Sequence, residues 1–86
     1  MMTEIEFDVL DELYFLQSYE YLIKTLKFDD KKLKSTLHIL LEKGWVKCYR
    51  TPNDEIEFDH SEFETDYWNY HYLASKSGLL AHNSNF

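Results

Sequence analysis

The chain has 86 residues, of which 44% are hydrophobic and 17% aromatic, and its formal net charge is −7 at pH 7. We expect one domain over residues 1–86, because a chain of this length has little room for a second core. The aromatic content argues against extensive disorder, and no apolar run approaches the roughly 20 residues that cross a bilayer. The acidic start MMTEIEFD is unlike a signal peptide, and the single Cys48 cannot form an internal disulfide, so we expect a cytoplasmic protein without membrane contact.

The charge is distributed unevenly along the chain. Eight of the nine basic residues lie between Lys24 and Arg50, where only three acids accompany them. Residues 1–20 contain six acids and no lysine or arginine, and residues 51–86 contain seven acids and one lysine. Because a partner meets a local surface rather than an average charge, this segregation matters more to binding than the net charge does.

The first half of the chain predicts three helices. Residues 5–16 place apolar side chains at helical spacing with acids between them, which is typical of an amphipathic helix. Ser18 stands at an N-cap position and predicts a second, short helix that ends near Lys27. A third helix is predicted over residues 31–43, because leucines recur at i, i+4, i+7 and i+8 after a capping aspartate. Gly44 follows that helix as a C-cap.

After Gly44 the apolar period changes from that of a helix to that of a strand. We expect a strand over residues 45–51, a turn over 51–55, a strand over 56–59, an acidic loop over 60–66 and a returning strand over 67–74. Ser75 predicts the cap of a last helix over residues 76–82. The predicted fold class is therefore mainly α with a small β-hairpin wing.

Residues 19–46, YEYLIKTLKFDDKKLKSTLHILLEKGWV, resemble the core of the winged helix-turn-helix family. In that core a short helix, a tight turn with one apolar residue and a recognition helix lead through a glycine into the wing. Residues 72–78, YLASKSG, are similar to the Y-x-L-T-x-x-G segment of the multiple-antibiotic-resistance and phenolic-acid regulator types, with Ala74 and Ser75 replacing the leucine and the threonine. The resemblance spans residues 5–82 and implies a three-helix core, a two- or three-stranded antiparallel wing and a C-terminal helix.

The resemblance implies a small bacterial transcriptional regulator that binds double-stranded DNA as a homodimer without a cofactor, with helix 31–43 in the major groove. The basic segment is compatible with this function, because lysines surround the start of that helix and Ser35 and His38 face outward toward base edges. The expected nucleic-acid-binding residues are Lys24, Lys27, Lys31, Lys32, Lys34, Ser35, His38, Lys47 and Arg50.

The acidic wing opposes DNA binding. Residues 54–66 contain seven acids and no lysine or arginine, and a phosphate backbone repels such a wing at close range. A second hypothesis is therefore a winged-helix module that does not bind DNA and instead contacts a protein partner through its acidic wing and aromatic surface. A third is a structural or adaptor protein, in which the lysines and the acidic loop are only solvated surface.

Catalytic and metal-binding patterns are missing from the sequence. It contains no phosphate-binding glycine loop, no nucleophile elbow and no H-E-x-x-H motif, so we expect no enzyme. Three histidines and the cysteine, His60, His71, His82 and Cys48, show no ligand spacing such as paired cysteines, so we expect no metal site.

Overall fold

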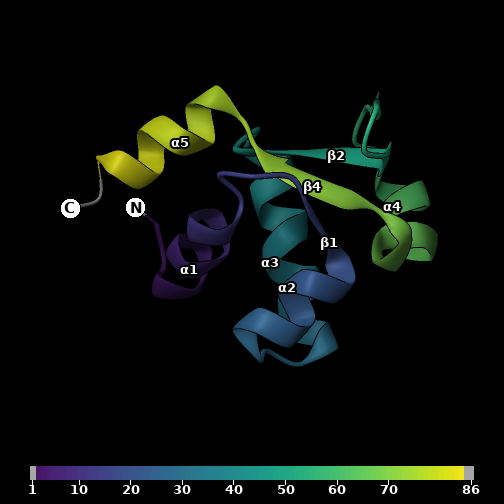
Figure 1. The fold of residues 1–86 in the computed structure, drawn as a ribbon, viewed down its shortest axis with the longest axis horizontal. Coiled ribbons are helices and arrows are strands. Elements are labelled where there is room, and N and C mark those ends of the chain that lie inside the picture. The colour runs from purple at the N-terminus through teal and green to yellow at the C-terminus, as the bar shows by residue number, and fades with distance from the viewer. Residues whose placement is uncertain (1, 85–86) are drawn as a thin grey trace.

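The computed structural model describes residues 2–84. The first half of the chain forms helix α1 (Glu4–Glu12), strand β1 (Gln17–Ser18), helix α2 (Tyr19–Leu26) and helix α3 (Asp30–Glu42), as Figure 1 shows. The second half forms β2 (Val46–Thr51), β3 (Asp54–Ile56), α4 (His60–Asp66), the 3-10 helix η1 (Tyr67–Asn69), β4 (His71–Ala74) and α5 (Lys76–Asn83). The described residues thus form a mixed α/β structure with five α-helices, none of which has both the length and the apolar character that crossing a bilayer requires.

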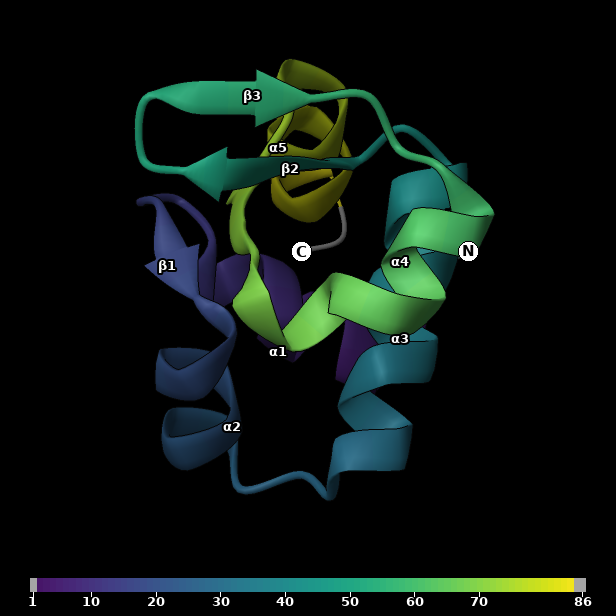
Figure 2. The ribbon, with the colours of Figure 1, turned by 90° about the vertical axis from the view of Figure 1, so that its right-hand side faces the viewer.

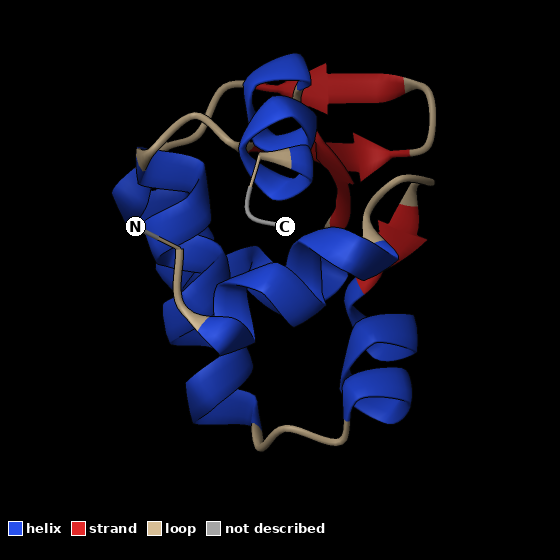
Figure 3. Cartoon of the chain, turned by 90° about the vertical axis from the view of Figure 1, so that its left-hand side faces the viewer, coloured by secondary structure: helices blue, strands red, loops and turns tan. Residues whose placement is uncertain are grey.

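The four strands form one antiparallel sheet with the order β1-β4-β2-β3. β2 is paired on both sides, with β4 through the register Val46↔Ala74 and with β3 through Cys48↔Ile56. Figure 3 shows the strands gathered along one side of the helices. The hairpin of β2 and β3 and the returning strand β4 are present as expected, and β1, which the sequence does not predict, extends them into a four-stranded sheet.

The core packs the helices against the sheet. Six leucines of the first three helical segments are completely buried, namely Leu10, Leu13, Leu22, Leu33, Leu37 and Leu40. Val46 and Cys48 of β2 are buried whereas Lys47 between them is exposed, which confirms the predicted strand period. Tyr72 of β4 is also fully buried, and its hydroxyl donates to the carbonyl oxygen of Tyr67 over 2.7 Å.

Side-chain caps begin the helices where the sequence predicts them. The residues that accept a backbone N–H of the first turn are Ser18 for α2, Asp29 for α3 and Ser75 for α5. α3 is followed by Gly44, whose φ of 76° lies in the left-handed region that favours glycine. This conformation lets the N–H of Trp45 donate to the carbonyl oxygen of Leu40 over 3.0 Å, which turns the chain from the helix into β2.

Residues 60–66 form a helix, α4, so the prediction of a loop there is wrong. The Asp59 carboxylate caps the helix by accepting the N–H of Glu62 over 3.0 Å. Phe63 is only 1% exposed and anchors the inner side of the helix in the core. Burial of this one aromatic ring stabilises a helix that the short acidic sequence does not predict, because most helical stability in proteins comes from tertiary packing.

The returning strand is shorter than predicted. It begins at His71 rather than at residue 67, because Tyr67–Asn69 continue from α4 as the 3-10 helix η1. Tyr67 in that turn is buried, so its packing outweighs the strand preference of the aromatic residues around it.

The first helix and the hairpin also differ from the prediction. α1 ends at Glu12 rather than at residue 16, and the carbonyl oxygen of Leu13 accepts the N–H of Ala74 over 2.9 Å. This bond directs the chain toward β4, where Gln17–Ser18 form an edge strand that the sequence does not predict. β3 occupies Asp54–Ile56 rather than residues 56–59, because the hairpin turns earlier than expected.

Candidate functional site

One face of α3 carries Asp30, Lys34, His38 and Glu42, which are spaced four residues apart and therefore lie in a row along the helix. We call this row the α3 stripe. Each of its members contacts residues of His60–Asn69, which comprise α4 and η1 and which we call the covering segment. Figure 2 shows α4 lying against α3. Because His60 meets Glu42 and Tyr67 meets Asp30, the covering segment runs opposite in direction to α3.

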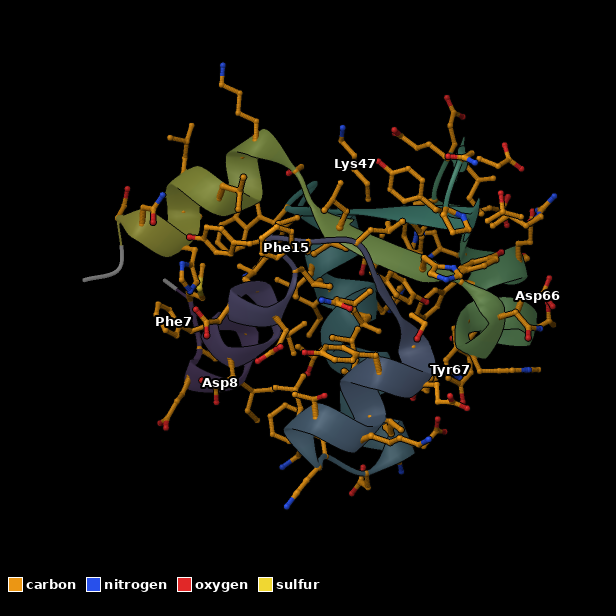
Figure 4. The ribbon with its side chains drawn as sticks, viewed as in Figure 1. Phe7, Asp8, Phe15, Lys47, Asp66 and Tyr67 are labelled. Carbon is orange, nitrogen blue, oxygen red and sulfur yellow. The ribbon has the colours of Figure 1, made fainter. Side chains whose placement is uncertain are left out.

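At the start of α3, two tyrosine hydroxyls converge on one carboxylate. Tyr67 donates to Oδ2 of Asp30 and Tyr19 donates to Oδ1, each over 2.6 Å. These hydrogen bonds, that of Tyr19 first and that of Tyr67 second, hold the pKa of Asp30 below its usual value. The same contact raises the pKa of Tyr67 to about 12. Figure 4 shows Tyr67 beside α2, whose Tyr19 packs its ring edge-on against that of Tyr67 with centroids 5.2 Å apart.

In the middle of the α3 stripe, Lys34 is bound by the covering segment. Its Nζ donates to Oε2 of Glu64 over 2.6 Å and lies 5.0 Å from the centroid of the Tyr67 ring. The hydrogen bond to Lys34 is also the main reason that the pKa of Glu64 lies below its ordinary value. Lys34 is therefore already engaged with an anion of the same chain.

At the far end of the stripe, His38 is held by aromatic and polar neighbours. Its ring stacks on Phe63, with centroids 5.6 Å apart and an interplanar angle of 19°. Its Nε2 lies 2.9 Å from Nδ1 of His60 and 3.6 Å from Oε1 of Glu42. His60 in turn places Nε2 3.9 Å from Oε2 of Glu42. His38, which we expected to face base edges, thus faces the covering segment.

Three more basic residues of the predicted site form ion pairs with acidic side chains. Arg50 of β2 contacts Glu62 of α4, which also accepts a hydrogen bond from the Tyr70 hydroxyl over 3.2 Å. Two further ion pairs, Lys47 with Glu55 at 3.9 Å and Lys24 with Glu20 at 3.7 Å, join exposed side chains. Figure 4 shows Lys47 pointing away from the sheet. Four of the lysines and arginines in the predicted site are therefore neutralised by nearby carboxylates.

Three predicted lysines remain without such partners. Within residues 2–84, the side chains of Lys27, Lys31 and Lys32 form no ion pair, and all three are exposed near the start of α3. Ser35 is exposed too, but its hydroxyl donates to the backbone oxygen of Lys31 over 2.9 Å. One turn further along the same side, the apolar Ile39 is 45% exposed. The structure thus leaves a short basic patch rather than a continuous one.

The aromatic side chains that follow α4 are mostly buried. Of the aromatics in residues 67–72, only Trp68 is exposed, at 51%, whereas Tyr67, Tyr70 and Tyr72 are buried. Two large apolar side chains elsewhere are at least as exposed, Phe15 at 76% and Leu80 at 59%.

The buried cysteine offers no reactive thiol. Cys48 is 2% exposed, and burial raises its pKa to about 11, so the nucleophilic thiolate is scarce at neutral pH.

Comparisons with protein-family models, with curated proteins and with solved structures found no match.

Proposed function

We propose that this chain is a winged-helix interaction domain that binds a protein partner rather than reading double-stranded DNA. The three-helix start, the hairpin of β2 and β3 and the last helix α5 support the winged-helix assignment, and the covering segment is an addition to that pattern. The observation that carries the functional proposal is the contact between the covering segment and the α3 stripe from Asp30 to Glu42.

The covering segment makes α3 a poor reader of DNA. The major groove is about 12 Å wide and admits one helix of about 10–12 Å diameter. A second helix fixed alongside α3 enlarges the unit that must enter the groove. It also brings the carboxylates of Glu62 and Glu64 to the place where phosphates would lie, and those carboxylates occupy Arg50 and Lys34.

The same region has features that suit a protein partner. Asp54, Glu57 and Asp66 form no ion pair within residues 2–84, so their charge is available to a second molecule. Trp68 follows Asp66 closely in sequence and exposes half of its surface. Tryptophan is enriched among the residues that dominate binding energy, and surrounding charge steers a complementary partner. We therefore propose a partner with a basic surface and an apolar pocket for Trp68.

Photo-crosslinking tests this proposal. A photoreactive phenylalanine analogue in place of Trp68 should crosslink to one protein in the cell of origin, and the double substitution Glu57→Lys/Asp66→Lys should abolish that crosslink. The matched control is Glu4→Lys/Asp8→Lys, which makes the same charge change on α1 and should leave the crosslink intact. A crosslink that survives Glu57→Lys/Asp66→Lys would contradict the proposed interface.

DNA binding is the second candidate, because Lys27, Lys31 and Lys32 are unpaired and lie at the start of α3. Phosphates bind well at helix N-termini, where backbone N–H groups and lysines meet them. Three phosphate contacts would give a logarithmic salt slope of about −2.7, and such contacts carry no sequence information by themselves. This candidate therefore predicts weak, salt-sensitive and sequence-independent binding.

A further inference from the structure

Two histidines and a glutamate from separate parts of the chain meet at the far end of the α3 stripe. His38 and Glu42 lie one turn apart on α3, and His60 is the first residue of α4. One ligand atom from each of the three side chains can be chosen so that all lie within 4.8 Å of one another. The convergence depends on α4, so it cannot be read from the spacing of these residues in the sequence.

The distances suit a small divalent cation. Zinc bonds to histidine nitrogen and carboxylate oxygen at about 2.0–2.2 Å, so ligand atoms around a tetrahedral zinc ion are about 3.3 Å apart. Nε2 of His38 lies 2.9 Å from Nδ1 of His60 and 3.6 Å from Oε1 of Glu42, whereas the other ring nitrogen of His60, Nε2, lies 3.9 Å from Oε2 of Glu42. One ligand atom from each side chain still lies within 4.8 Å of the other two. Small side-chain rotations bring these three groups to the required spacing.

Aromatic packing restricts the two imidazole rings. The Phe58 ring lies 5.5 Å from that of His38 and 4.8 Å from that of His60, measured between centroids. Phe63 also stacks on the His38 ring. Rings that are already oriented lose little conformational freedom when they bind a ligand, so this packing favours metal binding.

A hydrogen bond between the histidines is the simpler explanation of their contact. That bond uses one lone pair and one proton and leaves the Glu42 carboxylate at 3.6 Å or more, which is too long for a hydrogen bond. A cation would instead use lone pairs from all three side chains. His38 is 32% exposed and His60 is 63% exposed, so water can supply a fourth ligand.

We propose that His38, Glu42 and His60 form a binding site for a divalent transition metal of the zinc class, and that the bound metal ties α4 to α3. Imidazole with carboxylate suits zinc and its neighbours rather than magnesium or calcium, which prefer oxygen ligands alone. The inference rests on the contact between the two helices and does not depend on which macromolecule the domain binds.

Calorimetric titration with zinc, and visible spectra of the cobalt(II) form, test the site. The wild-type chain should bind one zinc ion per molecule, and the cobalt form should show the intense absorption of tetrahedral coordination. His60→Gln and Glu42→Gln should each weaken zinc binding by more than about tenfold, because each removes a ligand. The matched control is His71→Gln on β4, which removes a histidine outside the cluster and should bind zinc like the wild type.

Hydrogen exchange tests the proposed tie between the helices. Zinc should slow exchange of the α4 amides in the wild type and in His71→Gln, but not in His60→Gln, whose folding is checked by circular dichroism. Three results would overturn the proposal. They are no binding at millimolar zinc near pH 7.5, equal zinc affinity of the wild type and His60→Gln, and zinc binding that leaves α4 exchange unchanged.

Discussion

Lys34 on α3 donates a hydrogen bond to Glu64 on α4 over 2.6 Å, although the two residues are 30 positions apart in sequence. The pair joins the basic segment of the chain to its acidic segment. Part of the positive charge that suggests an anion-binding surface is thereby neutralised within the molecule. This relationship, repeated by Arg50 and Glu62, is why local positive charge in the sequence overstates the positive surface of the fold.

Removing the acids of α4 should increase non-specific DNA binding. Glu62→Gln/Glu64→Gln frees Arg50 and Lys34 for phosphates, so fluorescence anisotropy with a random duplex should show saturable, salt-sensitive binding at low salt, where the wild type shows none. The matched control is Asp54→Asn/Glu57→Gln. It changes net charge equally but neutralises two acids that form no ion pair within residues 2–84, so it frees no basic side chain. Equal gains in the two variants would mean that net charge, and not pairing with α3, governs the effect.

Phe63 should be the main anchor of the covering segment. Phe63→Ala removes a ring that is 1% exposed and should lower the free energy of unfolding by about 3–5 kcal/mol in a urea titration. Trp68→Ala, five residues later and half exposed, should change it by less than about 1 kcal/mol. If Phe63→Ala lowered the free energy of unfolding as little as Trp68→Ala does, burial of Phe63 would not be what holds α4 against α3.

The hydroxyl of Tyr67 should affect acid stability through Asp30. Because the folded-state pKa of Asp30 is lowered, its stabilising effect is present above the unfolded-state pKa of about 3.9 and is lost as pH falls through the lower folded-state value. Tyr67→Phe removes one donor, so the loss of unfolding free energy over that acidic range should become shallower. Tyr49→Phe, which removes a hydroxyl that forms no hydrogen bond to a carboxylate within residues 2–84, is the control and should leave the pH profile unchanged.

The two glycines should respond differently to substitution by alanine. A Cβ on Gly78 would lie 2.0 Å from the carbonyl oxygen of Trp45, so α5 would have to move away from the start of β2. A Cβ on Gly44 meets nothing within 4 Å, and its cost is that of the left-handed backbone, about 1–2 kcal/mol. Thermal unfolding should show Gly78→Ala to be the less stable variant, and the reverse order would contradict the close packing of α5 on β2.

Self-association should depend on Phe15 and Leu80. These are the most exposed large apolar side chains within residues 2–84, and exposed apolar surface favours association. We expect light scattering after size-exclusion chromatography to show a homodimer, and Phe15→Ser/Leu80→Ser to shift it to a monomer. A dimer that resists this double substitution but dissociates on Trp68→Ser would place the interface at η1 instead.

Local signals predict most of the fold, because caps and periodicity act within a few residues. Ser18, Asp29 and Ser75 cap the predicted helices, and Gly44 ends α3 as expected. α4 escapes prediction because its stability depends on burying Phe63 in a core that other elements supply.

The candidate site is less predictable than the fold. Its contacts join residues of α3 to residues between 18 positions (Glu42 with His60) and 37 positions (Asp30 with Tyr67) away, in a segment expected to be a loop and the start of a strand. His38 and His60 therefore look unrelated in sequence, and Lys34 looks free. Pairing between distant charges is a property of the packed structure, and composition or spacing cannot reveal it.

A low-salt titration of the wild-type chain into a labelled random DNA duplex, alongside Lys31→Glu/Lys32→Glu, tests directly whether α3 binds DNA. We predict that the wild type shows no saturable binding and that the variant behaves identically, because the covering segment keeps α3 out of the groove and the unpaired lysines alone offer too few phosphate contacts. Saturable wild-type binding that weakens with salt and disappears in Lys31→Glu/Lys32→Glu would contradict this prediction.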